Sequence, residues 1–254
     1  MEFLKYAALV EYDGALFNGF QVQTADRTVQ GELERALKNL TGEQNRINAA
    51  SRTDSGVHAM GQVVSFRVAE RFDTRTIVRG LNYYLADGVS VKGVCSVDDD
   101  FDVRRRALAR HYRYRIVKEE TPSPSTERVA LRVGRTLDIE AMRTAARFLV
   151  GMHDFSAFAT SLDEPTSTVR RVYEARFLTR DNMIEFWIAA NAFLRHQVRN
   201  TVGQLIQVGL RKTSIEMFAD LVQKARQGVA GPAVAPQGLC LVKITYETPL
   251  QFAV

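Results

Sequence analysis

The sequence has few cysteines and no long apolar run, and each shortage excludes a class of protein. Two cysteines in 254 residues, Cys95 and Cys240, are too few for a disulfide framework and match no zinc spacing. We therefore expect two buried free thiols in a reducing compartment. No apolar stretch approaches the roughly 18 residues that a membrane helix needs. The N-terminus enters a strand-like pattern without the features of a signal peptide, so we expect a cytoplasmic protein with no membrane partner.

Lysine is also scarce, because most of the basic residues are arginine. Of the 34 basic residues, 27 are arginines and seven are lysines, and the formal net charge is +5. The arginine guanidinium is a planar fork that matches phosphate and stacks on bases, so this balance favours an acidic partner. A GC-rich genome would raise the arginine content as well, and both explanations stay open.

Hydrophobic periodicity predicts an irregular alternation of strands and helices, which favours an α+β fold over a strictly parallel α/β sheet. Thr28 is the expected N-cap of the first helix. The Pro- and Ser-rich stretch at 121–126 divides the chain into two expected lobes, 1–120 and 121–254. Predicted strands lie at 6–12, 46–50, 62–68, 89–97, 110–117, 170–178, 183–190 and 239–246, and predicted helices at 29–40, 74–85, 138–150, 193–208 and 214–227.

One segment, residues 49–59, stands out as a candidate for chemistry. Small residues lead out of a predicted strand into Arg-Thr-Asp-Ser-Gly, and a long strand follows. Asp-Ser-Gly is typical of a turn, so Asp54 should lie at a loop tip between rigid flanks. A carboxylate there can act as a nucleophile or as a general base. On the local pattern alone, Asp54 could equally cap the turn and do nothing else.

The sequence from Ser51 to Val63, Ser-Arg-Thr-Asp-Ser-Gly-Val-His-Ala-Met-Gly-Gln-Val, resembles the signature of the TruA family of tRNA pseudouridine synthases. The resemblance implies an α+β chain of two similar ferredoxin/RRM-like lobes, joined through a mixed, mainly antiparallel sheet with a central cleft. Further segments that resemble the family follow in order along nearly the whole chain: Glu11–Gly14, Gly19–Gln21, Arg110–Tyr114, His153–Phe158, Asn191–Asn200 and Gly238–Leu241.

The resemblance also implies roles for individual residues. Asp54 matches the catalytic aspartate, which acts on a uridine whose base leaves C1′ of the ribose and reattaches through C5. Arg52 matches an arginine that helps to expose the target nucleotide, and Tyr112 matches the active-site tyrosine, which can stack on the uracil. Arg199 matches an arginine that pairs with the catalytic aspartate and keeps it ionised.

Four further residues are expected near this site. Leu239 would form a wall against the uracil, and His58, Tyr114 and His196 would support the site without carrying out the chemistry. Ordinary structural roles remain the alternative throughout: surface charges for the arginines, and core packing for the tyrosines and for Leu239.

The resemblance implies tRNA as the substrate, with uridines 38–40 of the anticodon stem-loop as the usual targets. It also implies a homodimer and neither a cofactor nor a metal. Phe20, Ser51 and Ser55 depart from the usual family pattern, which leaves open the uridines that are modified. Two rivals remain, a non-catalytic tRNA-binding protein and a metal-dependent hydrolase that uses Asp54 and His58. The acidic turn at 98–100 could hold a metal, although we expect a solvated loop.

Overall fold

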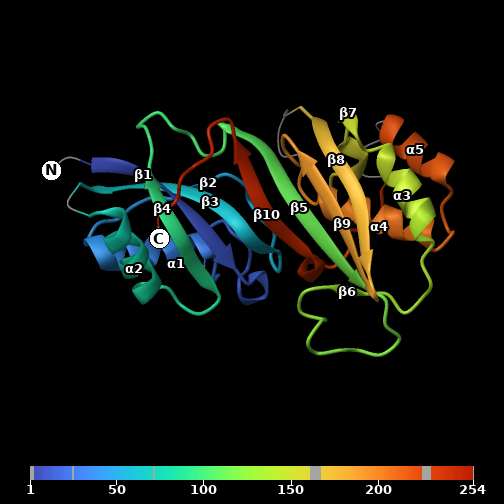
Figure 1. Cartoon of the computed structure of the whole chain (residues 1–254), viewed down its shortest axis with the longest axis horizontal. Helices are drawn as coiled ribbons and strands as arrows, with labels where there is room; N and C mark the ends of the chain where they lie inside the picture. Colours follow the sequence, from blue (N-terminus) through green and yellow to red (C-terminus); the bar gives the residue numbers. More distant parts are fainter. Residues whose placement is uncertain (1–2, 25, 71, 161–166, 225–229, 254) are drawn as a thin grey trace. The chain divides into compact units, whose positions relative to one another are not determined.

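The computed structural model describes residues 3–24, 26–70, 72–160, 167–224 and 230–253 (Figure 1). The chain forms two compact units, Met1–Arg110 with Cys240–Val254, and His111–Leu239. Each unit combines strands with helices, as the α+β prediction expects. The expected boundary between the lobes was residue 120. The units instead divide within two strands, because the C-terminal strand pairs with the N-terminal sheet.

The first unit is built around a long central strand, β1 (Phe3–Tyr12). It pairs antiparallel with β3 (His58–Ala69) and β4 (Val89–Ser96). The short strand β2 (Asn48–Ala49) pairs antiparallel with β3, whereas β10 (Leu239–Tyr246) pairs parallel with it. Two helices complete this unit, α1 (Val29–Thr41) and α2 (Thr74–Tyr84), which pack against each other (Figure 1).

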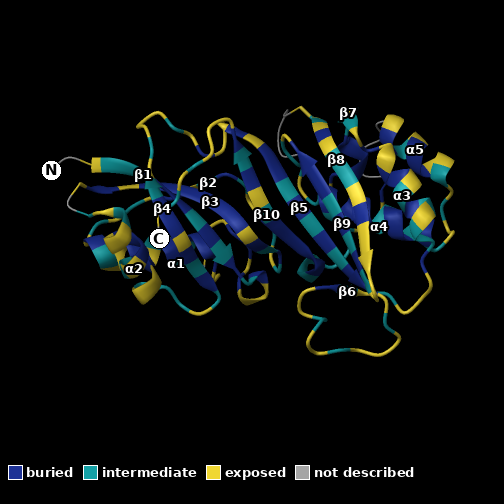
Figure 2. Cartoon of the chain, viewed as in Figure 1, coloured by how far each residue is buried: buried dark blue, intermediate teal, exposed yellow. Residues whose placement is uncertain are grey.

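In the second unit, β8 (Val169–Arg180) pairs antiparallel with both β7 (Gly151–Asp154) and β9 (Met183–Ala190). The strand β5 (Ala107–Val117) enters this unit at His111 and pairs parallel with β6 (Leu131–Arg132). Three helices pack against one another beside the strands: α3 (Ile139–Arg147), α4 (Gln197–Gly209) and α5 (Ile215–Gln223). Figure 2 shows buried residues along the strands of the first unit, and in both the strands and the helices of the second unit.

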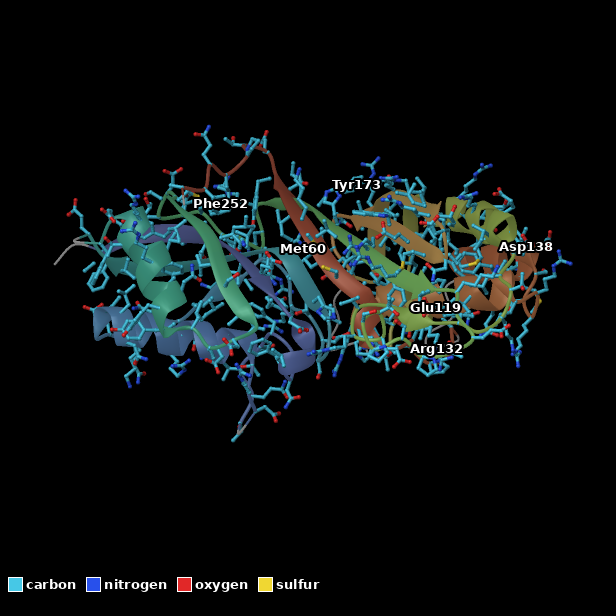
Figure 3. The ribbon with its side chains drawn as sticks, turned by 60° about the horizontal axis from the view of Figure 1, so that its bottom comes forward. Met60, Glu119, Arg132, Asp138, Tyr173 and Phe252 are labelled. Carbon is cyan, nitrogen blue, oxygen red and sulfur yellow. The ribbon has the colours of Figure 1, made fainter. Side chains whose placement is uncertain are left out.

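Local sequence explains where several helices begin. The Thr28 side chain accepts a hydrogen bond from the Gly31 N–H (3.3 Å), which confirms Thr28 as the N-cap of α1. Asp138 lies at the start of α3, where its carboxylate accepts from the Ala141 N–H at 3.0 Å (Figure 3). Gly42 ends α1 with φ 79°, a left-handed conformation that glycine adopts without strain.

Several elements differ from the sequence prediction, among them the start of α4 and the short strands β6 and β7. The helix predicted to begin at 193 begins at Gln197, because His196 takes a left-handed conformation with φ 62°. Arg195 therefore precedes the helix, whereas Arg199 lies within it. The strand β7 was not predicted, since it has only four residues and is held by its pairing with β8. The predicted end of α5, at 225–227, lies outside the described residues.

The acidic turn at 98–100 is held by basic side chains. Arg67 Nη1 lies 2.7 Å from Asp99 Oδ1, and Arg106 Nη2 lies 2.9 Å from Asp100 Oδ2. These pairs agree with the expectation of a solvated turn. Within the described part of the chain, no helix combines the length and the apolar character that crossing a bilayer requires.

Candidate active site

Asp54 lies half-buried in a turn between β2 and β3. The Val57 N–H donates to the Asp54 carbonyl at 3.2 Å, and Gly56 takes φ 79°, so the chain reverses within four residues. A glycine at position 56 adopts this conformation at no steric cost. The turn predicted from Asp-Ser-Gly is present, and it leaves the Asp54 side chain partly open to solvent.

The residues next to Asp54 are fixed by two buried side chains of the neighbouring strands. The Thr53 hydroxyl lies 2.7 Å from the Tyr12 hydroxyl at the end of β1. The fully buried amide of Gln62 holds both backbone groups of Ser51: its Nε2 donates to the Ser51 carbonyl (2.7 Å), and its Oε1 accepts from the Ser51 N–H (3.3 Å). Asp54 is therefore preorganised by contacts on its N-terminal side.

A second loop, at residues 13–20, packs against the same turn. The Phe20 N–H donates to the Thr53 carbonyl at 3.0 Å. His58 Nδ1 accepts from the Gly14 N–H at 3.2 Å and lies 3.1 Å from Asp13 Oδ1. His58, the first residue of β3, thus joins this loop to the strand, a position that suits the supporting role expected for it.

Arg52 is exposed, whereas the nearby Arg110 is buried. The Arg110 guanidinium donates to three carbonyls, those of Ala50 (3.0 Å), Arg104 (2.6 Å) and Ala107 (2.9 Å). A guanidinium has five donors in a rigid plane, so it can hold several carbonyls in a fixed arrangement. Arg110 therefore ties the loop before β5 to Ala50, the residue that precedes the catalytic segment, which we define as residues 51–58.

Replacing Thr53 with Val tests how firmly the catalytic segment is held. The substitution keeps the shape of the side chain but removes one hydrogen-bonding partner of the buried Tyr12 hydroxyl, so we expect a loss of about 1–3 kcal/mol in the free energy of unfolding. Urea unfolding measures it. Thr179→Val, at an exposed position of β8, is the control and should change stability by less than about 0.5 kcal/mol. Equal midpoints for both variants would show that the Thr53–Tyr12 contact contributes nothing.

The remaining predicted site residues lie in the second unit. Tyr112 is 5% exposed, and its ring meets that of Phe193 edge-on, with centroids 5.3 Å apart. Tyr114 is fully buried, and its hydroxyl donates to the Ala235 carbonyl at 2.6 Å. Burial raises the pKa of Tyr114 well above its usual value, so the phenol stays protonated.

Arg199 lies in the first turn of α4, and its Nε donates to the Val234 carbonyl at 2.8 Å. Arg199 and Tyr114 thus hold adjacent carbonyls, those of Val234 and Ala235, in the segment that leads to Leu239. Leu239 is 5% exposed and begins β10. The structure therefore brings Arg199 and Tyr114 together with the 234–239 segment inside the second unit.

His196 occupies the N-cap position of α4, where its Nδ1 lies 2.9 Å from the Thr160 hydroxyl. The neighbouring Asn200 side chain donates to the Phe158 carbonyl at 2.6 Å. These contacts fix the turn before α4, and with it the direction in which the helix carries Arg199. His196 therefore lies at the start of the helix that carries Arg199, and its supporting role stays a prediction.

No role was predicted for three residues that shape the site, Tyr12, Gln62 and Arg110. Each is a polar residue in or beside a run of strand residues, and each is at most 7% exposed. A polar side chain at a core position usually has a specific hydrogen-bonding partner. That signal could have marked Gln62 and Arg110, although it could not have named the partners.

Comparisons with known proteins give one consistent family. A family model described as tRNA pseudouridine synthase matches residues 8–104 and 145–247. The tRNA pseudouridine synthase A of Roseiflexus sp. strain RS-1 is 46% identical over 94% of this chain and 90% of its own length. The enzyme of the same name from Citrifermentans bemidjiense is 39% identical over 94% of this chain and 96% of its own length. The enzyme of Chloroflexus aurantiacus strain J-10-fl is 40% identical over 96% of this chain and 89% of its own length.

Proposed function

Because this chain belongs to the tRNA pseudouridine synthase family and is an isomerase of tRNA uridine, we propose that it converts uridines 38–40 of the anticodon stem-loop, with Asp54 as the catalytic carboxylate. The observation that carries the proposal is the catalytic segment. Its aspartate lies partly open to solvent, while Thr53, Ser51 and His58 around it are held by side chains or backbone of neighbouring elements.

The reaction breaks the bond between N1 of uracil and C1′ of the ribose and forms a bond between C5 and C1′. C5 loses a proton and N1 gains one, so atoms and electrons balance within the nucleotide. No electron acceptor and no second substrate are required. In this proposal Asp54 supplies the carboxylate that acts on the uridine, as nucleophile or as base.

The other site residues take supporting parts in the proposal. Arg52 offsets the cost of unstacking the target uridine, which is a few kcal/mol. Tyr112 stacks on the exposed uracil, and Leu239 lies against it. For Arg199 we propose the role that the family resemblance implies, that of the arginine which acts together with the catalytic carboxylate. We further propose that the enzyme acts as a homodimer in the cytoplasm.

The test is a pseudouridine assay on unmodified tRNA transcripts, with the modified positions mapped at single-nucleotide resolution and the reaction run in excess chelator. We expect pseudouridine at 38, 39 or 40, at the same rate with and without chelator, since no step uses a metal. Chelation would stop the rival metal-dependent hydrolase, because metal binding is reversible. Pseudouridine at other positions would keep the chemistry and reject the anticodon site.

A further inference from the structure

A basic pocket lies beside the catalytic segment, within the first unit. Its volume is about 360 Å³, within the roughly 300–1,000 Å³ typical of small-ligand pockets. We call it the arginine pocket, because four of its lining residues are Arg46, Arg52, Arg104 and Arg105. Among the described residues that line it, Asp102 is the one carboxylate. Four positive charges against one negative charge make the lining attractive to an anion.

The single carboxylate of the arginine pocket already has partners. Asp102 Oδ1 accepts from the backbone N–H groups of Arg104 (2.8 Å) and Arg105 (3.0 Å). The hydrogen bond from the Arg105 N–H is the main cause that lowers the pKa of Asp102. Asp102 therefore remains ionised at neutral pH and orders the turn that presents both arginines to the pocket.

The walls of the arginine pocket are built from fixed backbone. Arg110 holds the Arg104 and Ala50 carbonyls together, and the Tyr246 hydroxyl donates to the Val103 carbonyl at 2.8 Å. In another part of the lining, the buried Gln30 side chain donates to the Ile47 carbonyl at 3.2 Å. Two separate chain segments, residues 46–52 and 102–105, thus bring their arginines to one preformed hollow, which lowers the entropic cost of binding.

We propose that the arginine pocket binds a phosphate of the tRNA backbone close to the target uridine. The proposal rests on the function proposed above. Arg52 lines the pocket and precedes Asp54 by two residues, a span of at most about 7 Å of extended chain. A phosphate held there lies near the catalytic carboxylate, so the grip on the backbone stabilises the strand while the uridine leaves its stack.

A double-mutant cycle tests this proposal, with Arg104→Gln/Arg105→Gln as the protein change. The RNA change is a single neutral methylphosphonate linkage, placed in turn along the anticodon arm of full-length tRNA. Dissociation constants are measured by fluorescence anisotropy. At one linkage we expect neutralisation to weaken wild-type binding about tenfold and the variant's binding hardly at all. The slope of log Kd against log salt should be lower for the variant by about 0.7–0.9, which is the change expected when one phosphate contact is lost.

Arg75→Gln/Arg79→Gln is the matched control, because it removes two exposed arginines of α2 that do not line the pocket. In this control variant, each neutral linkage should weaken tRNA binding by the same factor as it does in wild type. Arg46→Gln provides a second test from the other lining segment, and its effect should couple to the same linkage. Circular dichroism and urea midpoints check that each variant is folded.

The proposal would be overturned if, for both pocket variants and at every linkage, the losses of tRNA affinity from the protein change and from the RNA change simply added together. A second outcome would also overturn it: a variant that binds a mononucleotide such as UMP more weakly than wild type does, but binds tRNA equally well. The pocket would then bind a free phosphate ester and not the tRNA backbone. Pseudouridine is measured in the same RNAs. If wild type forms none, the proposed function fails, whereas the coupling energies still decide whether the pocket grips the backbone.

Discussion

Replacing Asp54 with Asn should lower the rate of pseudouridine formation roughly 10,000-fold, the scale expected when a catalytic carboxylate is lost. The amide has the same size and shape as the carboxylate but carries no charge and is a far weaker nucleophile and base. Asp54 is half-buried, so the fold should tolerate the change. Single-turnover rates on saturating tRNA measure the chemical step, and anisotropy measures tRNA affinity, which should change less than about threefold.

Asp98→Asn is the control for this substitution. Asp98 is an exposed aspartate of the acidic turn in the same unit, and its loss changes the net charge by the same amount. It should leave the rate within about twofold of wild type. An Asp54→Asn enzyme that kept a tenth of the wild-type rate would exclude Asp54 as the catalytic group. A loss of tRNA binding in step with the rate would instead make Asp54 a binding residue.

The sequence predicted the elements whose formation depends on local signals. Thr28 supplies a side-chain cap at the start of α1, and Gly42 supplies the left-handed residue that ends it, so both ends of that helix are encoded nearby. The turn at Asp54 likewise depends on neighbouring residues, since Gly56 alone provides the positive φ. Such features could be read from a few consecutive residues.

Elements that depend on distant partners were missed or misplaced. The strand β7 exists because Gly151–Asp154 pairs with Val169–Val172 of β8, and four residues alone carry no strand signal. The start of α4 was misplaced because the conformation of His196 is set together with its contact to Thr160, 36 residues away. In both cases tertiary contacts override the local pattern.

The same distinction holds for the candidate site. Asp54 and Arg52 could be named from a contiguous signature, whereas the residues that hold them could not. Tyr12 and Thr53 are 41 residues apart, and Arg110 and Ala50 are 60 residues apart. A single sequence contains no record of which buried polar group meets which, so these positioning contacts required the structure.

Gly14→Ala should both destabilise the protein and slow the reaction, because Gly14 touches the backbone of the catalytic segment. A Cβ at this position would lie 2.1 Å from the Val57 carbonyl oxygen and 2.8 Å from its nitrogen. Backbone atoms of a buried residue cannot move aside as a flexible side chain can, so either the loop or the segment must shift. We expect a loss of about 3 kcal/mol or more in the free energy of unfolding, the upper end for overpacking.

The effect on the rate follows from the same displacement. Gly14 also donates its N–H to His58, so a shift of the loop would disturb both ends of the turn that carries Asp54. Urea unfolding and single-turnover rates measure the two effects. Gly134→Ala is the control, since its nearest neighbour would be the Glu119 carbonyl oxygen at 3.5 Å, an ordinary contact. If Gly14→Ala unfolded at the same urea concentration as this control and reacted as fast, the close packing of residues 13–20 would have no part in positioning Asp54.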